Sequence, residues 1–332
     1  MTMNNNFLNN LLNSISVSGY EEQVQDIVEE EMKDYVDEVR RDEMQNVTCV
    51  INPNSDIRIM LSAHADEIGL MISNIREDGR LQVIDRGGIV PSTYPGHAIS
   101  IKTSKGIVYG VVEAYRELFK EKDLGTKQFR IDIGAKDRED ALSYVSIGDP
   151  IVLDTTIRKL ANDKFTARAL DDRLGVYIIM EAIKRAKKQG CTVGVYAAST
   201  TGEETTKTGA YWTSTRINPS MAIVVDVTYT SDCSGMDPAE MGTVLLGGGP
   251  VLCNSPIVVK ALNTKMEECA KTAGIQIQRE AASRLSYTDG DKIHFSNQGV
   301  PTVLVSIPLR YMHMPAEVAD EKDVEGFDEF IK

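Results

Sequence analysis

The sequence is short of cysteine, of basic residues and of long apolar runs, and each shortage excludes a class of protein. Its five cysteines are scattered along 332 residues without CxxC spacing, which predicts reduced thiols, a cytoplasmic location and no structural zinc finger. With 36 basic against 49 acidic residues the net charge is −13. We therefore expect no nucleic-acid partner and no anionic membrane partner, since both require a basic face.

Signals for membrane insertion and secretion are also missing. No apolar stretch reaches the roughly 18 residues of a membrane span. The opening residues have neither the basic nor the apolar region of a signal peptide, so we expect none. The hydrophobic share of 42% is enough for one large core or two domains, so we expect a soluble globular protein.

The hydrophobic pattern predicts an α/β fold that a β-rich segment interrupts. Ser18 and Glu21 have capping-box spacing, and the apolar residues after them predict a helix over 18–32. Between 71 and 164 the sequence has short alternating strands, typical of a small all-β unit. Outside it we predict helices at 172–188 and 255–273, the latter started by Ser-Pro, and strands at 47–51, 57–63, 192–200, 221–226, 275–279 and 302–307. Residues 1–70 and 165–332 would thus form one domain with a mixed or parallel sheet covered on both faces, and 71–164 an inserted domain.

Acids and histidines stand where several of these elements meet loops. They are His64 and Asp66, Asp171 and Asp172, Glu203 and Glu204, Asp226, and His313. Ligands of open α/β sheets bind at the carboxyl ends of the strands, so we expect these side chains to converge. Carboxylate oxygens and imidazoles suit Zn²⁺, Co²⁺ or Mn²⁺ in a catalytic site.

Each residue taken singly has an ordinary explanation. A histidine after a strand is usually a surface or hydrogen-bonded residue, an aspartate before a helix is usually an N-cap, and paired glutamates usually face solvent. The pattern gains weight because the sequence has four histidines and two of them fall in it. His97 and His294 have no acidic partner at a strand end, and we interpret them as structural.

Five ordered segments resemble the glutamyl-aminopeptidase family of tetrahedral, or deblocking, aminopeptidases. They are "HADEIGLMI", "ALDDRLGVYI", "GEET…TGAYW", "VVDVTY" and "GVPTVLVSIPLRYMHMPAE". The resemblance implies a zinc-peptidase α/β/α sandwich with two divalent metal ions. Zn²⁺ and Co²⁺ are the first candidates for these ions, and Mn²⁺ is the third. The resemblance also implies a barrel-like insertion used in oligomer contacts and a dimer-based tetrahedral dodecamer that degrades peptides from a free N-terminus.

The resemblance also assigns roles. Asp171 would bridge both metal ions, with His64 and Asp226 completing the ligands of one ion and Glu204 and His313 those of the other. Asp172 would follow Asp171 across a cis peptide, and Asp66 would hold the His64 ring. Glu203 would be the general base, acting on a water between ions expected about 3.5–4 Å apart. The neighbouring glutamates would then have different functions, since a cation neutralises Glu204.

Departures from the family pattern leave the substrate preference open. Thr201-Gly202 and Thr205-Thr206 flank the glutamate pair where Val-Gln and Val-Gly are usual, Leu309 replaces a smaller or polar residue, and Cys233 follows the Asp226 strand. Two other enzyme classes and a non-enzymatic cage are the alternative interpretations. A dinuclear-metal deacylase or amidohydrolase of N-acyl amino acids would use the same ligands, whereas an endoglucanase would need a carboxylate pair and no histidines.

Overall fold

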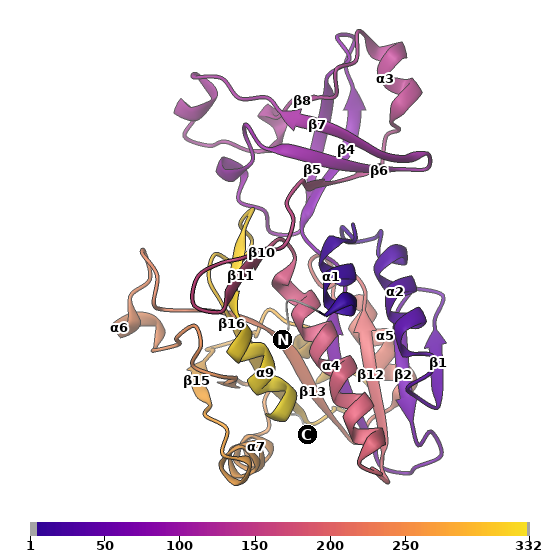
Figure 1. The fold of residues 1–332 in the computed structure, drawn as a ribbon, viewed down its shortest axis with the longest axis vertical. Coiled ribbons are helices and arrows are strands. Elements are labelled where there is room, and N and C mark those ends of the chain that lie inside the picture. The colour runs from indigo at the N-terminus through magenta and orange to yellow at the C-terminus, as the bar shows by residue number, and fades with distance from the viewer. Residues whose placement is uncertain (1–4, 331–332) are drawn as a thin grey trace.

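The computed structural model describes residues 5–330, which form an α/β unit and a closed β-barrel (Figure 1). The α/β unit contains an eight-stranded sheet in the order β1-β2-β12-β3-β13-β16-β14-β15. Its strands are β1 (Glu38–Arg41), β2 (Val47–Ile51), β3 (Arg58–His64), β12 (Gly194–Thr200), β13 (Met221–Tyr229), β14 (Val251–Asn254), β15 (Gln278–Ala281) and β16 (Thr302–Leu309). The central strands β12, β3, β13 and β16 are parallel to one another. On either side of them, β2 pairs antiparallel with β12 and β14 pairs antiparallel with β16.

Helices cover both faces of the sheet. The helices of the α/β unit are α1 (Asn6–Asn13), α2 (Glu22–Met32), α4 (Leu170–Lys188), α5 (Thr208–Ile217), α6 (Pro238–Met241), α7 (Lys260–Ala273), α8 (Gly290–Ile293) and α9 (Glu321–Phe330), of which the short α6 stands to the side of the sheet (Figure 1). One core cluster joins α1, α2, α4 and α9 to alternate residues of the central strands. The other residues of those strands pack against α5 and α8. Among residues 5–330, no helix combines the length and apolar composition needed to cross a bilayer.

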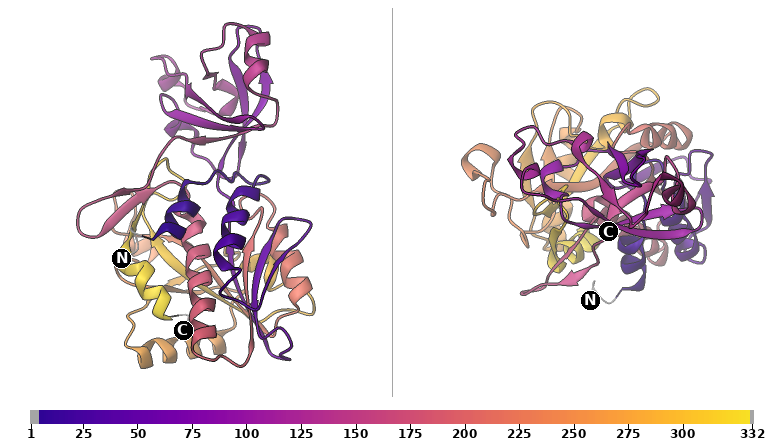
Figure 2. Two further views of the ribbon diagram at one scale, coloured as in Figure 1. Left: turned by 45° about the vertical axis from the view of Figure 1, so that its right-hand side comes forward. Right: turned by 90° about the horizontal axis from the view of Figure 1, so that it is seen from above.

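The barrel stands at one end of the α/β unit and has its own core (Figure 2). Its strands close in the order β4-β5-β8-β7-β6-β9. They are β4 (Gly69–Ile75), β5 (Leu81–Arg86), β6 (Ala98–Thr103), β7 (Gly106–Val112), β8 (Ile131–Asp132) and β9 (Pro150–Leu153), accompanied by α3 (Arg138–Tyr144). The chain leaves the barrel through β10 (Arg158–Lys159) and β11 (Lys164–Ala167). These two strands pair with each other, and β11 also pairs with β17 (Glu317–Asp320).

The predicted fold class is confirmed: a mixed α/β sheet is interrupted by a small β-barrel. The predicted capping box is wrong, because α2 begins after Glu21 without a side-chain cap. Ser18 Oγ instead contacts Thr205 Oγ1 at 2.8 Å, and Glu21 Oε1 accepts from the N–H of Gly202 at 3.1 Å. Both residues thus brace the turn that carries the paired glutamates.

The helix predicted from the Ser-Pro pair begins later than expected. Val258 forms a β-bridge with Thr302, and the N–H of Val259 donates to the Thr302 carbonyl oxygen at 3.0 Å. These residues therefore lie alongside the start of β16 in an extended conformation, and α7 begins only at Lys260. The strand predicted at 275–279 lies at Gln278–Ala281, and β13 continues past Asp226 to Tyr229.

Candidate active site

Four parallel strands bring the predicted site residues to one edge of the sheet. His64 is the last residue of β3 and pairs in register with Thr200, the last residue of β12, three residues before Glu203. Asp226 lies on β13 opposite Ser306 of β16, and His313 follows the end of β16. This edge is formed by the carboxyl ends of parallel strands, where the sequence predicted a ligand site.

Asp171 joins two clusters of candidate metal ligands. The first contains His64, Asp171 and Asp226, and the second contains Asp171, Glu204 and His313; within each, one ligand-type atom per residue lies within 4.8 Å of the others. Asp171 Oδ1 is 3.1 Å from His64 Nε2, and its Oδ2 is 3.3 Å from His313 Nε2. The two oxygens of one carboxylate therefore face different clusters.

Backbone carbonyl groups orient both histidines. His64 Nδ1 is 3.1 Å from the carbonyl oxygen of Asp66, and His313 Nδ1 is 2.9 Å from that of Gly88 in the barrel. A neutral ring that donates through Nδ1 presents an unprotonated Nε2, the arrangement typical of a metal-ligating histidine. Gly88 suits this contact, because a Cβ there would lie 3.1 Å from His313 Nδ1.

Asp66 connects His64 to the glutamate pair. Its Oδ1 accepts from the N–H of Glu203 at 3.0 Å and its Oδ2 from that of Glu204 at 3.1 Å, while Oδ1 lies 3.4 Å from His64 Nδ1. Its carboxylate thus fixes the turn of the glutamate pair, and its carbonyl makes the shorter contact with the histidine. The sequence predicted the contact with His64 but not the contacts with the turn.

Asp172 follows Asp171 across a cis peptide bond and is not a member of either cluster. Its Oδ2 accepts from the N–H of His64 at 3.2 Å, and its Oδ1 from the N–H of Gly175 at 3.2 Å. Burial raises the pKa of Asp172 well above its ordinary value, and repulsion from Asp226 adds to the rise.

The site concentrates negative charge in a buried place. The six acidic residues singled out from the sequence all have buried side chains here: Asp66, Asp171, Asp172, Glu203, Glu204 and Asp226. Burial, opposed by His64 and reinforced by Asp171, raises the pKa of Asp226 to about 8, and burial also raises the pKa of Glu204. Burial lowers the pKa of His313, but its contacts with Asp171 and Glu204 raise it to about 12. A divalent cation would relieve this repulsion, and each cluster has the oxygen and nitrogen donors that such ions bind.

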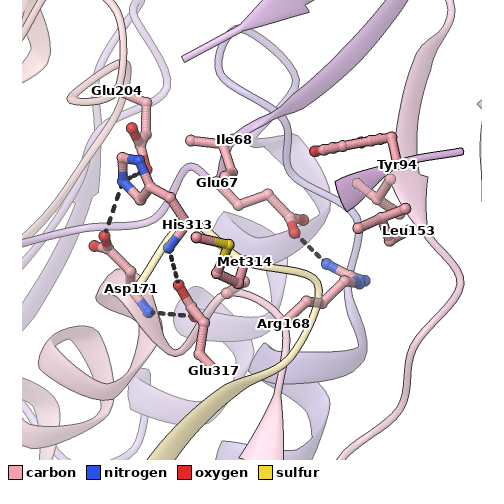
Figure 3. A pocket seen from close by; sticks show the side chains of 12 residues that line it. Glu67, Ile68, Tyr94, Leu153, Arg168, Asp171, Glu204, His313, Met314 and Glu317 are labelled. Atoms are coloured by element: carbon pink, nitrogen blue, oxygen red, sulfur yellow. Dashed lines mark hydrogen bonds and ion pairs between the residues drawn. The ribbon is translucent and has the colours of Figure 1, made fainter. Parts of the chain in front are cut away.

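Glu317 is a site residue that the sequence analysis missed. Its Oε1 accepts from the N–H of His313 at 3.0 Å and its Oε2 from that of Asp171 at 3.3 Å, as Figure 3 shows. Burial raises its pKa to about 8, with repulsion from Asp171. Glu317 stands in the quoted segment "RYMHMPAE", four residues after His313, but the spacing did not reveal that β17 returns it to the site.

Two cavities adjoin the clusters. The smaller, drawn in Figure 3, is about 30 Å³ and lies between Asp171, His313 and barrel residues Tyr94 and Leu153. The larger is about 500 Å³, and its lining includes both histidines, the glutamate pair, Asp226, Lys207 and Tyr287. The larger cavity is therefore the one with room for a substrate beside the clusters.

The remaining residues singled out from the sequence lie elsewhere. His294 caps the C-terminal end of α8, where its Nδ1 is 2.9 Å from the Gly290 carbonyl oxygen, and His97 is exposed just before β6. Cys233 Sγ is 3.8 Å from the Thr230 carbonyl oxygen. None of these three residues is a member of either cluster in the described chain.

Comparison with known proteins agrees with this geometry. Residues 45–330 match the family model described as M42 glutamyl aminopeptidase. A lysyl aminopeptidase of Pyrococcus furiosus is 33% identical over 326 residues, covering 95% of this chain and 92% of the relative.

Solved structures show the same fold over nearly the whole chain. The TET aminopeptidase of the marine sediment archaeon Thaumarchaeota archaeon SCGC AB-539-E09 has a TM-score of 0.92 at 31% identity, covering 98% of this chain and 93% of that one. The Pyrococcus horikoshii TET1 peptidase, which can assemble into a tetrahedron or a large octahedral shell, has a TM-score of 0.87 at 30% identity, with coverages of 98% and 97%. The resemblance predicted from the sequence is confirmed. The chain belongs to the M42 glutamyl aminopeptidase family, a family of peptide hydrolases.

Proposed function

We propose that this protein is a dinuclear-metal aminopeptidase that removes N-terminal residues from short peptides. The observation that carries the proposal is the pair of donor clusters that share Asp171, beside Glu203 on the wall of a cavity of about 500 Å³. A concave site of this size, with a few convergent polar groups, is typical of small-substrate enzymes.

His64, Asp171 and Asp226 would hold one divalent ion, and Asp171, Glu204 and His313 the other. The support is the donor set, the Nε2 orientation of both histidines and the repulsion among the buried carboxylates. Zn²⁺ and Co²⁺ suit these ligands best, and Mn²⁺ is the third candidate. When bound, such ions supply Lewis-acid polarisation of the peptide carbonyl and lower the pKa of water.

Glu203 is the proposed general base. Its side chain is 6% exposed, and its Oε2 lies 3.9 Å from His64 Nε2, so one oxygen faces the first cluster. Burial raises the pKa of the Glu203 carboxyl well above its ordinary value, which makes it a better proton acceptor. The carboxylate would take a proton from the attacking water and deliver it to the leaving amine nitrogen.

We further propose that copies of this chain assemble through the inserted barrel. The support is a group of exposed apolar side chains, here called the barrel patch: Ile107, Tyr109, Val111, Tyr115 and Phe119. Ile107, Tyr109 and Val111 alternate along β7, so they share one face of the strand. By analogy with the TET1 peptidase, the proposed assembly is a dimer-based tetrahedral dodecamer. A reducing compartment, the cytoplasm, suits the five cysteines, which are free in the described chain.

The test is to compare peptides that have a free N-terminus with the same peptides acetylated. Hydrolysis of the free-amine peptides alone, one residue at a time, is the expected result. Hydrolysis of the acetylated compounds alone would instead indicate the deacylase or amidohydrolase. Cleavage of β-glucan with no effect of a chelator would indicate an endoglucanase.

A further inference from the structure

Lys207 lies beside the proposed general base because a tight turn brings it there. The N–H groups of Thr206 and Lys207 both donate to the Gly202 carbonyl oxygen, at 2.9 and 2.7 Å, and Lys207 has a left-handed φ of 55° just before α5. Its side chain is 21% exposed and that of Glu203 is 6% exposed. The pair is therefore largely shielded from water, unlike the exposed i,i+4 pairs that contribute little.

The Lys207 ammonium group contacts two partners of different kinds. Nζ donates to Glu203 Oε1 in a close ion pair, and to the backbone carbonyl oxygen of Tyr287 at 2.7 Å. Burial lowers the pKa of Lys207, but the surrounding acids, Glu203 first and then Asp226 and Asp289, together raise it above its ordinary value. With Oε1 held by the lysine, Oε2 is the oxygen of Glu203 that faces His64.

Tyr287 belongs to the wall of the larger cavity and is held from two sides. The N–H groups of Ser286 and Tyr287 donate to the Asp291 carboxylate at 2.8 and 2.9 Å, and the Tyr287 carbonyl accepts from Lys207. Tyr287 has a φ of 61°, uncommon outside glycine, and is 75% exposed. These hydrogen bonds hold the backbone of Tyr287, and with it the attachment point of the aromatic side chain, at the wall of the cavity.

We propose that Lys207 is a positioning residue that directs Oε2 of Glu203 toward the metal-ligand clusters and locks the Tyr287 wall of the substrate cavity. The inference rests on the proposed aminopeptidase function, because it assumes that Glu203 is the base. One side chain would then couple the geometry of the base to the wall that contacts substrate. Lys207 is not a member of either ligand cluster.

The experiment measures kcat and KM on one free-amine peptide, together with bound metal and the thermal midpoint, for four variants. Lys207→Met removes both contacts, and Lys207→Arg keeps a cation. Asp291→Asn weakens the hydrogen bonds to the N–H groups of Ser286 and Tyr287 and leaves the Lys207–Glu203 ion pair in place. Lys271→Met is the matched control on the exposed surface of α7. If Lys207→Met does not fold, Lys207→Gln replaces it, since it keeps a donor but loses the charge and the reach.

The expected result separates the two contacts. Lys207→Met lowers kcat about 10- to 100-fold, the scale of a misplaced catalytic group, and raises KM, while bound metal is unchanged. Lys207→Arg restores most of kcat. Asp291→Asn raises KM roughly 3- to 10-fold, the scale of one lost hydrogen bond, with little change in kcat.

Three results would overturn the inference. If Lys207→Met has the kinetics of Lys271→Met, the lysine positions nothing. If Lys207→Met and Lys207→Arg both lose bound metal and kcat together, the role is structural. If the wild-type protein binds metal but cleaves no free-amine peptide, the proposed function fails, and the inference fails with it.

Discussion

At the residue scale, the site depends on side chains that each meet two partners. Asp171 faces a histidine with each oxygen, and Asp66 holds two consecutive backbone N–H groups with its carboxylate. Paired glutamates at a strand end would repel each other in the absence of such contacts. Here Glu204 lies 3.5 Å from His313, and Glu203 is paired with Lys207, so the neighbours have separate surroundings.

Glu203→Gln tests the general base. The variant keeps the size of the side chain but cannot accept a proton, so we expect turnover to fall by roughly two to four decades. Bound metal and the thermal midpoint should remain those of the wild type. Glu268→Gln, on the exposed surface of α7, is the matched control. Normal turnover in Glu203→Gln would show that another group takes the proton.

Glu317→Ala tests the residue that the sequence analysis missed. Its carboxylate holds the N–H groups of Asp171 and His313, so its loss should loosen two ligands of the second cluster. We expect metal affinity to fall about 10- to 100-fold, the usual effect of removing a residue that orients ligands. Competition with a chelator of known affinity measures this change, and an unchanged affinity would mean that the ligands need no such support.

At the element scale, strands were predicted better than helix starts. Alternating or continuous apolar runs identified β2, β3, β12 and β16 because burial on both faces of the sheet leaves a local signal. The start of α2 was mispredicted because Ser18 and Glu21 bond the turn of the glutamate pair, about 180 residues away in the sequence. Lys207 and Glu317 were missed for a related reason. Each has one partner four residues away, but each also has a distant one, Tyr287 for Lys207 and Asp171 for Glu317, which spacing does not encode.

Asp323 links α9 to the loop before β14 and gives a pH prediction. Its two carboxylate oxygens accept from the N–H groups of Gly247 and Gly249, at 2.7 and 2.8 Å. Burial nevertheless raises its pKa from 3.8 to about 6. Between these pH values the folded protein holds a proton that the unfolded chain has released. The stability that this group contributes is therefore full below about pH 4 and is lost as pH rises through about 6.

Asp323→Asn removes this titration. The difference in the free energy of unfolding, wild type minus variant, should fall by about 3 kcal/mol between pH 4 and pH 6 and stay constant above. Urea denaturation of both proteins at several pH values measures it, and other titrating groups cancel in the difference. A difference that does not change with pH would contradict the raised pKa.

At the scale of the whole molecule, the barrel has its own core but also contributes residues to the site. The Gly88 carbonyl orients His313, and Tyr94 and Leu153 close the smaller cavity. The sequence indicated a β-rich insertion from its turn residues and short strands. It did not indicate that a loop between β5 and β6 reaches a histidine some 225 positions later, because no local pattern marks that contact.

Tyr109→Asp tests assembly through the barrel patch. A charge in the middle of an apolar contact would be desolvated without a partner, so we expect the variant to form smaller species than the wild type. Analytical ultracentrifugation over a range of concentrations measures the change. Ile57→Asp, at an exposed apolar position of the α/β unit, is the control and should assemble normally. Equal masses for wild type and Tyr109→Asp would place the contact elsewhere.

The proposed dinuclear site is tested by stripping the protein of metal and returning Zn²⁺, Co²⁺ or Mn²⁺ in measured amounts. Bound ions per chain and hydrolysis of a free-amine peptide are followed in the same samples. If the site is dinuclear as proposed, the stripped protein is inactive and activity returns as two ions bind per chain. Activity that survives without metal, or a protein that binds none, would contradict the proposed site.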